Sequence, residues 1–349
     1  MSITSIHGRG AADNPKNRFE AIARIPLPDY DPTEDPAPQT QFFHDRTRNI
    51  LSKNDSPDIP FTYGLNPYRG CEHGCVYCYA RPTHEYLGFS AGLDFETRIM
   101  VKEDAPALLR KQFLSPKWSP QEVGIGTVTD AWQPIERRLK LTRQCLEVFA
   151  EFRNPVGLVT KNALVARDAD LLASLARHNA AQAFVSVTSL DPELARIMEP
   201  RASAPAARLR AISELREAGV PVGVMVAPII PGLNDHEAPA ILDAVARAGA
   251  IAAYYVVLRL PLGLKELFTD WLSRHFPERV DKVLGRIRDT RGGELNDSRF
   301  GIRMRGEGLW AETFNQLFRV SRSKAGLADH MPELTAEHFR RPGSQATLF

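Results

Sequence analysis

Cysteine is scarce in this chain, with four residues among 349. Three of the four fall within eight positions, 71 to 78, which is too close together to staple distant segments. Disulfide frameworks belong mainly to small secreted domains, whereas a chain of this length with 43% hydrophobic residues can bury a large core without them. The cysteines are therefore expected to be metal ligands in a reducing compartment.

Long apolar runs and a strong net charge are also missing. No run approaches the roughly 20 apolar residues of a membrane-spanning helix, and the first 20 residues lack the apolar segment of a secretory signal. The formal net charge is only +2, so nothing global favours a nucleic-acid or membrane partner. These absences predict a cytoplasmic protein without a membrane partner.

The chain divides by pattern near residue 61. Residues 1–60 are rich in Pro, Asp, Asn and Gln without helical or strand periodicity, which predicts an extended arm with little structure of its own. Beyond it, short apolar runs alternate with amphipathic segments, as in repeated strand-helix units. Strands are expected within 61–65, 122–130, 156–162, 183–190, 220–230 and 251–261, and helices within 103–113, 136–152, 165–178, 191–198, 204–218 and 236–248.

Six such units predict an α/β fold, specifically an incomplete (β/α)6 TIM-type barrel over residues 61–262. A doubly wound sheet is the alternative, but no G-x-G-x-x-G motif follows the first strand. Residues 263–349 are expected to form a helical, Arg-rich C-terminal extension. In barrels of this type the chemistry lies on loops at the C-terminal ends of the strands.

Cys71, Cys75 and Cys78 form a C-x3-C-x2-C motif directly after the first predicted strand. Soft thiolates favour zinc or an iron-sulfur cluster. A structural zinc site needs four protein ligands, and His73 or His84 could supply the fourth. A [4Fe-4S] cluster held by three cysteines instead leaves one iron open for a small molecule. The absence of a second cysteine pair favours the cluster; a non-catalytic, zinc-binding (Cys3His) nucleic-acid adaptor is the alternative.

The cysteine motif, with Tyr77 just before its third cysteine, resembles the radical S-adenosylmethionine (SAM) superfamily. The segments "YGLNPYRGCEHGCVYCYARP", "GTVTDAWQPIE" and "TKN" are similar to a bacterial subgroup related to spore photoproduct lyase, and the resemblance covers about residues 60–262. It implies a [4Fe-4S] cluster on the three cysteines and reductive cleavage of SAM to a 5′-deoxyadenosyl radical that abstracts hydrogen from a substrate. It also implies an electron donor such as flavodoxin or ferredoxin.

The substrate stays open in this interpretation. The lyase resemblance implies a further cysteine that returns hydrogen to the product, and no cysteine follows Cys145, which itself fits the apolar face of a predicted helix. This argues against the lyase reaction itself. DNA-lesion repair and modification of a protein, RNA or small molecule both stay open. The arginines between 286 and 305 could bind the phosphates of a nucleic acid or pair with neighbouring carboxylates.

Polar groups that could hold SAM are expected at the ends of the second and third strands. The superfamily resemblance places the methionine amino group at the second strand end, where Thr127, Thr129 and Asp130 stand in place of the usual Gly-Gly-Glu. The two threonines could equally pack as β-branched strand residues. Lys161, after the third strand, could pair with the SAM carboxylate or be an ordinary solvated lysine.

The resemblance places further cofactor contacts at the next two strand ends. Ser186 and Thr188 fall where the fourth strand of the superfamily contacts ribose or carboxylate. The segment "PIIPGLND" partly matches the adenine motif, so backbone contact to adenine is expected near Ile230. Tyr77 is expected to stack on the adenine or pack beside it.

Overall fold

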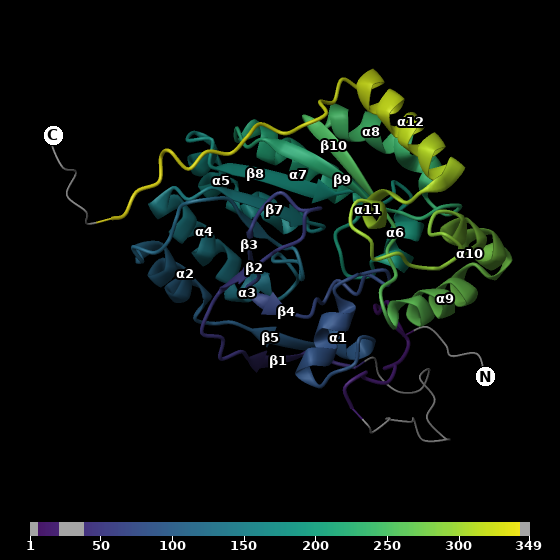
Figure 1. Ribbon diagram of the computed structural model, residues 1–349. Coiled ribbons are helices and arrows are strands. Elements are labelled where there is room, and N and C mark those ends of the chain that lie inside the picture. Colours follow the sequence, from purple (N-terminus) through teal and green to yellow (C-terminus); the bar gives the residue numbers. More distant parts are fainter. Residues whose placement is uncertain (1–5, 21–37, 343–349) are drawn as a thin grey trace.

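The computed structural model describes residues 6–20 and 38–342, and its centre is a seven-stranded sheet (Figure 1). The strand order is β10-β9-β8-β7-β6-β3-β2. Neighbours from β3 to β10 are all parallel, and β2 alone pairs antiparallel, with β3. The strands are β2 (Leu51–Lys53), β3 (Tyr63–Leu65), β6 (Val123–Ile125), β7 (Val156–Thr160), β8 (Ala181–Ser186), β9 (Val222–Ile229) and β10 (Ala252–Val257). The predicted α/β fold with a mostly parallel sheet is confirmed.

Helices join the parallel strands wherever the sequence pattern predicts them. They are α2 (Ala105–Leu114), α3 (Glu136–Leu139), α4 (Leu141–Phe152), α5 (Ala169–Ala176), α6 (Pro192–Met198), α7 (Pro205–Glu217) and α8 (Ala238–Arg247). The 3-10 turns η2 (Ala163–Asp168) and η3 (Asp235–Glu237) precede α5 and α8. The single helix predicted over 136–152 is in fact two, because Lys140 has a left-handed backbone with φ of 54°. Local periodicity carries no sign of that break.

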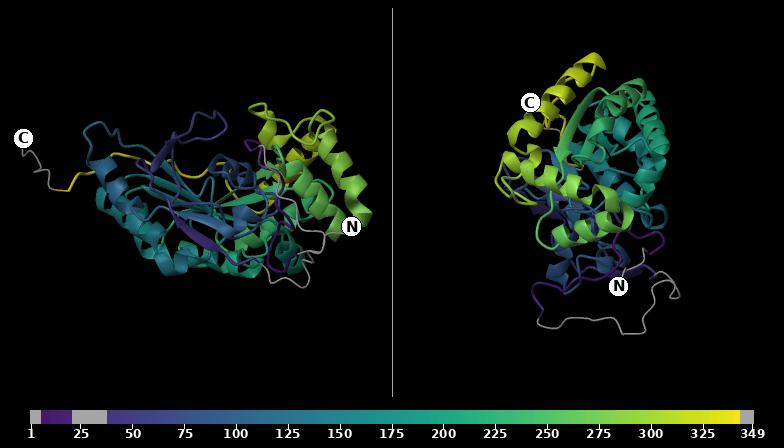
Figure 2. Two further views of the ribbon diagram at one scale, coloured as in Figure 1. Left: turned by 90° about the horizontal axis from the view of Figure 1, so that it is seen from below. Right: turned by 90° about the vertical axis from the view of Figure 1, so that its right-hand side faces the viewer.

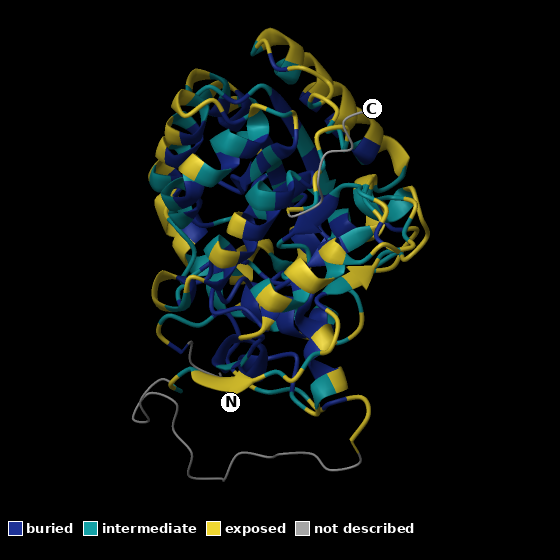
Figure 3. Ribbon diagram, turned by 90° about the vertical axis from the view of Figure 1, so that its left-hand side faces the viewer, coloured by how far each residue is buried: buried dark blue, intermediate teal, exposed yellow. Residues whose placement is uncertain are grey.

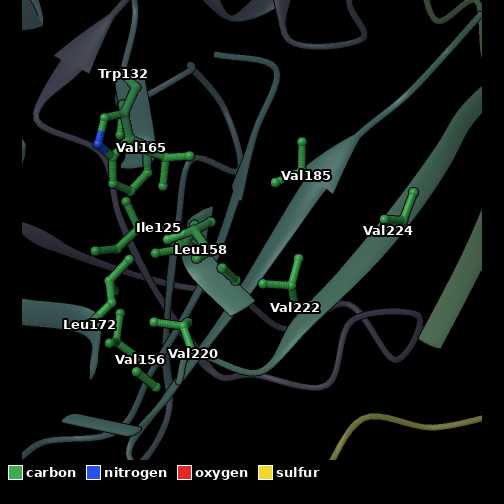
Figure 4. Packing of buried hydrophobic residues seen from close by; sticks show 14 of the residues in the cluster. Ile125, Trp132, Val156, Leu158, Val165, Leu172, Val185, Val220, Val222 and Val224 are labelled. Carbon is green, nitrogen blue, oxygen red and sulfur yellow. The ribbon is translucent and has the colours of Figure 1, made fainter. Parts of the chain in front are cut away.

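The main core lies between the sheet and these helices. It is built from β-branched and leucine side chains of the strands, such as Ile125, Val156, Leu158 and Val224 (Figure 4). All four are at most 1% exposed, as expected for strands of a parallel sheet that is covered by helices. Figure 3 shows the same division, with buried strands inside and exposed residues on the outer turns of the helices.

Two short strands lie within residues 1–60, where the sequence predicts an extended arm with little structure of its own, and both pair with strands outside this region. β1 (Gln41–His44) pairs with β5 (Arg98–Val101), which also pairs with β4 (Tyr68–Arg69) in a separate three-stranded sheet. β2 is the other strand of this region. The β1 sequence, QFFH, lacks the apolar alternation that marks a strand, and all four of its residues are exposed. Pairing with a distant segment forms it.

The C-terminal region is helical, as the sequence predicts. Its elements are α9 (Leu264–His275), η4 (Pro277–Arg279), α10 (Val280–Asp289), α11 (Ile302–Arg305) and α12 (Gly308–Lys324). Helices α9, α10 and α12 lie at the end of the molecule opposite α2 and α4 (Figure 1 and Figure 2). None of the described helices is long and apolar enough to cross a bilayer.

The chain after α12 runs along the N-terminal ends of the strands. Ala328 forms a parallel bridge with Ala252 at the start of β10. The Thr335 amide then donates to the Asn179 carbonyl just before β8, and the Arg340 amide donates to the carbonyl at the end of α4. This path leaves the C-terminal ends of the strands to the cysteine loop.

The loop between β2 and β3 closes part of the sheet face. The Phe61 ring lies so close to Gly124 of β6 that a Cβ there would come within 2.5 Å of it. Earlier in the same loop, Asp58 accepts hydrogen bonds from the Gly301 amide (2.7 Å) and from the Arg303 guanidinium of α11. We call this contact the Asp58–Arg303 clasp. It joins the β2–β3 side of the sheet to the segment that follows β10.

Candidate metal centre and cofactor pocket

The cysteine loop, residues 70–80, lies between β4 and the 3-10 helix η1 (Arg81–Leu87). Two glycines shape it, because Gly70 and Gly74 have φ of 78° and 69°, which other residues rarely adopt. There is also no room for a larger side chain at either position. A Cβ on Gly74 would come within 2.7 Å of the Glu96 carboxylate, and one on Gly70 within 2.9 Å of the Phe95 carbonyl oxygen. The loop can therefore curl tightly enough to gather its three thiols.

The three cysteines of the loop are free of disulfides; Cys71 and Cys75 are buried, and Cys78 is partly buried. Burial raises the pKa of Cys71, Cys75 and Cys78. The neighbouring thiols raise the pKa of Cys71 further, so the three groups lie within electrostatic range of one another. Thiolates are the ligand form, and thiolates packed together in this way need positive charge to stabilise them. A soft, cationic iron-sulfur cluster fits this donor set.

A buried ion pair holds the back of the loop. The Arg81 guanidinium donates to the Cys75 carbonyl (3.0 Å) and the Gly74 carbonyl (3.2 Å), so it fixes the loop backbone directly. Its charge is balanced by Glu96 at 2.5 Å, and both side chains are fully buried. Glu96 in turn accepts the amide of Ala11 (2.9 Å). The pair thus ties the cysteine loop to the N-terminal segment.

The N-terminal segment 6–20 packs closely on the cysteine loop. A Cβ on Gly10 would come within 1.8 Å of the Gly74 carbonyl oxygen, so only glycine fits there. Asn17 donates to two backbone carbonyls near η1, and Arg18 pairs with Glu85 at 2.6 Å. Specific contacts therefore bind this segment to the site, although its sequence has no periodic pattern.

Tyr77 is fixed beside the thiols by a second buried network. Its hydroxyl donates to Glu199, which also accepts from Thr188 at 2.6 Å and is paired with the guanidinium of Arg208. Burial opposes ionisation of Glu199, but Arg208 and Lys161 outweigh it and lower the pKa of Glu199 to about 2. The tyrosine ring is thus held by a charged group that is itself fully paired.

Lys161 is the group in this region that is best placed to receive an anion. Its Nζ lies 5.8 Å from the centre of the Tyr77 ring. It is close enough to lower the pKa of Glu199 and to oppose the rise in the pKa of Cys75. Within the described part of the chain, its ammonium group makes no hydrogen bond or ion pair. The predicted contact to the SAM carboxylate stays a prediction that this geometry permits.

Asp130 and Thr129 are engaged with the protein. Asp130 accepts from Thr160 (2.8 Å), from the Lys161 amide (2.8 Å) and from His73, 3.3 Å away. Burial opposes its ionisation, but His73 and these donors lower the pKa of Asp130 to about 2. Thr129 donates to the Gly70 carbonyl at 2.6 Å. In this structure both residues bind the cysteine loop to the strand ends, and their contacts to SAM stay predictions.

The other predicted cofactor residues lie at neighbouring strand ends. Ser186 ends β8 and is buried, and its carbonyl accepts from Arg208 at 3.1 Å. Thr127 is half-buried after β6, and its carbonyl accepts from the Tyr79 hydroxyl. The Ile230 amide donates to the Asn234 side chain at 2.7 Å, so this amide is already paired. All eight predicted residues therefore gather around one end of the sheet: Tyr77, Thr127, Thr129, Asp130, Lys161, Ser186, Thr188 and Ile230.

The zinc alternative needs a histidine as its fourth ligand. The ring of His73 pairs with Asp130 through Nδ1 and with Asn162 (3.1 Å) through Nε2. The His84 Nε2 pairs with the Arg98 carbonyl at 2.9 Å, and burial lowers the pKa of His84 to about 4. Among residues 6–20 and 38–342, no group of three or more His, Cys, Asp or Glu side chains is arranged to hold a single metal ion. In a cluster, by contrast, each cysteine binds a different iron.

Sequence reasoning missed the two buried ion pairs of the site. Arg81 and Glu96 carry no local signal, because each lies in a short 3-10 or helical turn. Arg208 does carry one. It shares the inward face of α7 with Ala211, Ile212 and Leu215, at the spacing of a buried stripe, and a charged residue in such a stripe indicates a buried partner.

Known proteins resemble this chain in sequence. The sequence profile of the radical SAM superfamily matches residues 65–245. The uncharacterized protein Rv2578c of Mycobacterium tuberculosis is 39% identical over 226 residues, which is 64% of this chain and 66% of that protein. The uncharacterized protein MJ0683 of Methanocaldococcus jannaschii is 27% identical over 221 residues, 63% of this chain and 79% of that one. The matched region thus spans just under two thirds of the length of the mycobacterial relative.

Solved structures show the same fold. Spore photoproduct lyase complexed with dinucleoside spore photoproduct superimposes with a TM-score of 0.59 at 18% identity, covering 82% of this chain and 80% of the lyase chain. A mutant of the same lyase gives the same TM-score at 19% identity. At this level of identity the likeness is one of fold.

Proposed function

The chain belongs to the radical SAM superfamily, whose enzymes use a [4Fe-4S] cluster and SAM, and from that premise we propose that Cys71, Cys75 and Cys78 hold the cluster here. When bound, the cluster supplies an electron that cleaves SAM to methionine and a 5′-deoxyadenosyl radical, which abstracts hydrogen from a substrate. The observation that carries the proposal is the set of three free thiols, two of them buried and one partly buried, in one glycine-shaped loop at the C-terminal ends of the strands.

The surrounding residues have distinct roles in this proposal. Lys161 binds the SAM carboxylate, because its ammonium group has no other partner among the described residues. Tyr77 lies beside the cofactor with its ring orientation fixed by Glu199. Asp130 positions the Lys161 backbone and the cysteine loop, since its carboxylate accepts the Lys161 amide at 2.8 Å and contacts His73 within the loop.

We also propose that the six parallel strands form an incomplete (β/α)6 barrel. Tyr79 supports this, because it contacts both Thr127 beyond β6 and Arg259 beyond β10. These strands are four places apart in the sheet order, which would separate them by about 19 Å in a flat sheet. Contact of one side chain with both strand ends supports a sheet whose strand ends curve toward one another.

Anaerobic reconstitution with iron and sulfide tests the cluster assignment. The expected product is brown and holds about four irons per chain, and it releases 5′-deoxyadenosine when given SAM and dithionite. Cys75→Ala should lose the iron while Cys145→Ala, which removes a buried thiol outside the loop, should keep it. A colourless protein that binds one zinc and releases no deoxyadenosine would establish the adaptor alternative instead.

The substrate and the electron donor are part of the same proposal. The lyase was solved with dinucleoside spore photoproduct, which makes ultraviolet-damaged DNA the first substrate to test, with undamaged DNA as the matched control. Conversion of the damaged DNA that requires SAM would favour a reaction of the lesion-repair type. Replacing dithionite with reduced flavodoxin or ferredoxin tests the proposed donor.

A further inference from the structure

Arg259 lies beside the cysteine loop but belongs to the other edge of the sheet. It follows the last residue of β10 by two positions, and its guanidinium carbon lies 5.4 Å from the centre of the Tyr79 ring. Tyr79 directly follows Cys78, is 46% exposed, and is held by its hydrogen bond to Thr127. A molecule from solvent that reaches Tyr79 therefore also reaches Arg259.

Arg259 has no counterion among the described residues. Within 6–20 and 38–342 it forms no ion pair, and its Nε is buried without a hydrogen-bond partner. Besides its contact with the Tyr79 ring, the guanidinium makes a weak contact from Nη1 to the Met304 sulfur at 3.8 Å. A partly buried guanidinium without oxygen acceptors loses hydration without compensation.

The two neighbouring arginines show what a structural role looks like in this region. Arg303 is neutralised by Asp58 in the Asp58–Arg303 clasp. Arg291 is buried and donates to the carbonyls of Leu258 (2.7 Å) and Ile302 (3.0 Å). In the described part of the chain, Arg259 has neither a carboxylate nor a carbonyl acceptor.

Like charges surround Arg259 as well. Burial and the charge of Arg303 lower the pKa of Arg259, and Arg259 in turn contributes to the lowered pKa of Arg291. Asp58 is near but is already occupied by Arg303 and the Gly301 amide. An added anion would relieve this excess of positive charge, and a guanidinium binds a planar or tetrahedral oxyanion through two parallel hydrogen bonds.

We propose that Arg259 binds an oxyanion group, a phosphate or a carboxylate, of the molecule that enters beside the cysteine loop, with the Tyr79 ring as the adjoining wall. The inference rests on the proposed function only in naming that molecule as the substrate of the radical reaction. Arg259 would then orient the substrate from the β10 side, while Lys161 binds the SAM carboxylate on the β7 side.

Anion binding by the full-length protein, without SAM or turnover, tests the proposal. Calorimetric titrations with sodium phosphate and with sodium acetate, each against sodium chloride at matched ionic strength, distinguish the two oxyanion classes. We expect saturable binding of at least one of them, weakened at least tenfold in Arg259→Gln. Arg319→Gln, which removes an exposed arginine from α12, is the matched control and should bind as the wild type does.

Stability provides the second measurement. Because Arg259 is an uncompensated cation among like charges, Arg259→Gln should unfold at the same or a higher temperature than the wild type in low salt. Should that variant fail to fold, Arg259→Lys keeps the charge but cannot form two parallel hydrogen bonds, and it must still weaken oxyanion binding severalfold.

Three results would overturn the proposal: no saturable oxyanion binding, equal affinity in the wild type and Arg259→Gln, or, if only Arg259→Lys folds, equal affinity in that variant. Iron content and deoxyadenosine release are measured separately. A failure of anion binding is therefore distinguishable from a failure of the proposed SAM chemistry.

Discussion

The buried pair of Arg81 and Glu96 provides a sharp test of how the cysteine loop is held. Glu96→Gln keeps the shape of the side chain but removes its charge, leaving a fully buried guanidinium without its counterion. Removing one partner of such a pair costs about 3–5 kcal/mol. A glutamine oxygen must also serve the amides of Gly10 and Ala11, which the two carboxylate oxygens now share. We expect a loss at the upper part of that range.

Such a loss is a large part of the stability of a typical domain, which is about 5–15 kcal/mol. Urea denaturation of the reduced apoprotein at pH 7 measures it as a lower midpoint with an unchanged slope. Glu193→Gln is the matched control, because Glu193 is 74% exposed and pairs only loosely with Arg196. It should change the free energy of unfolding by less than about 0.5 kcal/mol.

A double-mutant cycle isolates the pair itself. Arg81→Met also removes the donor to the Cys75 and Gly74 carbonyls, so this single variant should be at least as unstable and should take up less iron. The double variant should cost less than the sum of the two single changes by about 2 kcal/mol or more, because no unpaired charge is left buried. Strict additivity, or a loss below about 1 kcal/mol in Glu96→Gln, would refute this account of the loop.

Three further predictions concern Lys102, Phe149 and Asp58. Burial lowers the pKa of Lys102 to about 8, below the value in the unfolded chain. Below pH 8 the folded wild type therefore carries a buried ammonium group that reduces its stability. Its free energy of unfolding rises as the pH rises from about 8 to 10.5, because in this range the unfolded chain binds more protons than the folded one. Lys102→Met should therefore be about 1–2 kcal/mol more stable than the wild type at pH 7, a figure that already includes the loss of the hydrogen bond to the Asn66 carbonyl. Urea denaturation should show that this difference in stability disappears near about pH 10.5. Phe149→Ala should cost about 3–5 kcal/mol in the same assay, since Phe149 is fully buried in the main core; a loss below about 1 kcal/mol would contradict that packing. Asp58→Asn weakens the clasp, so hydrogen exchange should speed up in residues 300–305 and stay unchanged in α4.

Local signals were enough to predict the six parallel strands, the approximate positions of the helices between them and the cysteine motif. Each of the six predicted strand segments overlaps one parallel strand, because a strand covered on both faces must be a short run of apolar, largely β-branched residues. The three thiols could be predicted to lie together because they fall within eight consecutive residues. The break at Lys140 and the exposed strand β1 could not be seen, since neither changes the periodicity of the chain.

The partners of buried charges were not visible in the same way. Arg208 and Glu199 are nine residues apart and meet across a turn, whereas Arg81 depends on Glu96 and, through it, on the amides of Gly10 and Ala11. Sequence separation says nothing about such contacts. They form only when packing excludes water and forces each charge to find a counterion.

The sequence by itself determined the family, the alternation of strands and helices, and the three thiols, because these depend on the order of residues over short stretches. Tertiary structure alone decided that Asp130 holds the cysteine loop, that Lys161 is left without a partner among the described residues, and that Arg259 comes to lie over Tyr79 from the opposite edge of the sheet. The physical reason is tertiary packing. It brings side chains from distant strands to one place, and burial there decides which charges are paired and which remain for a ligand.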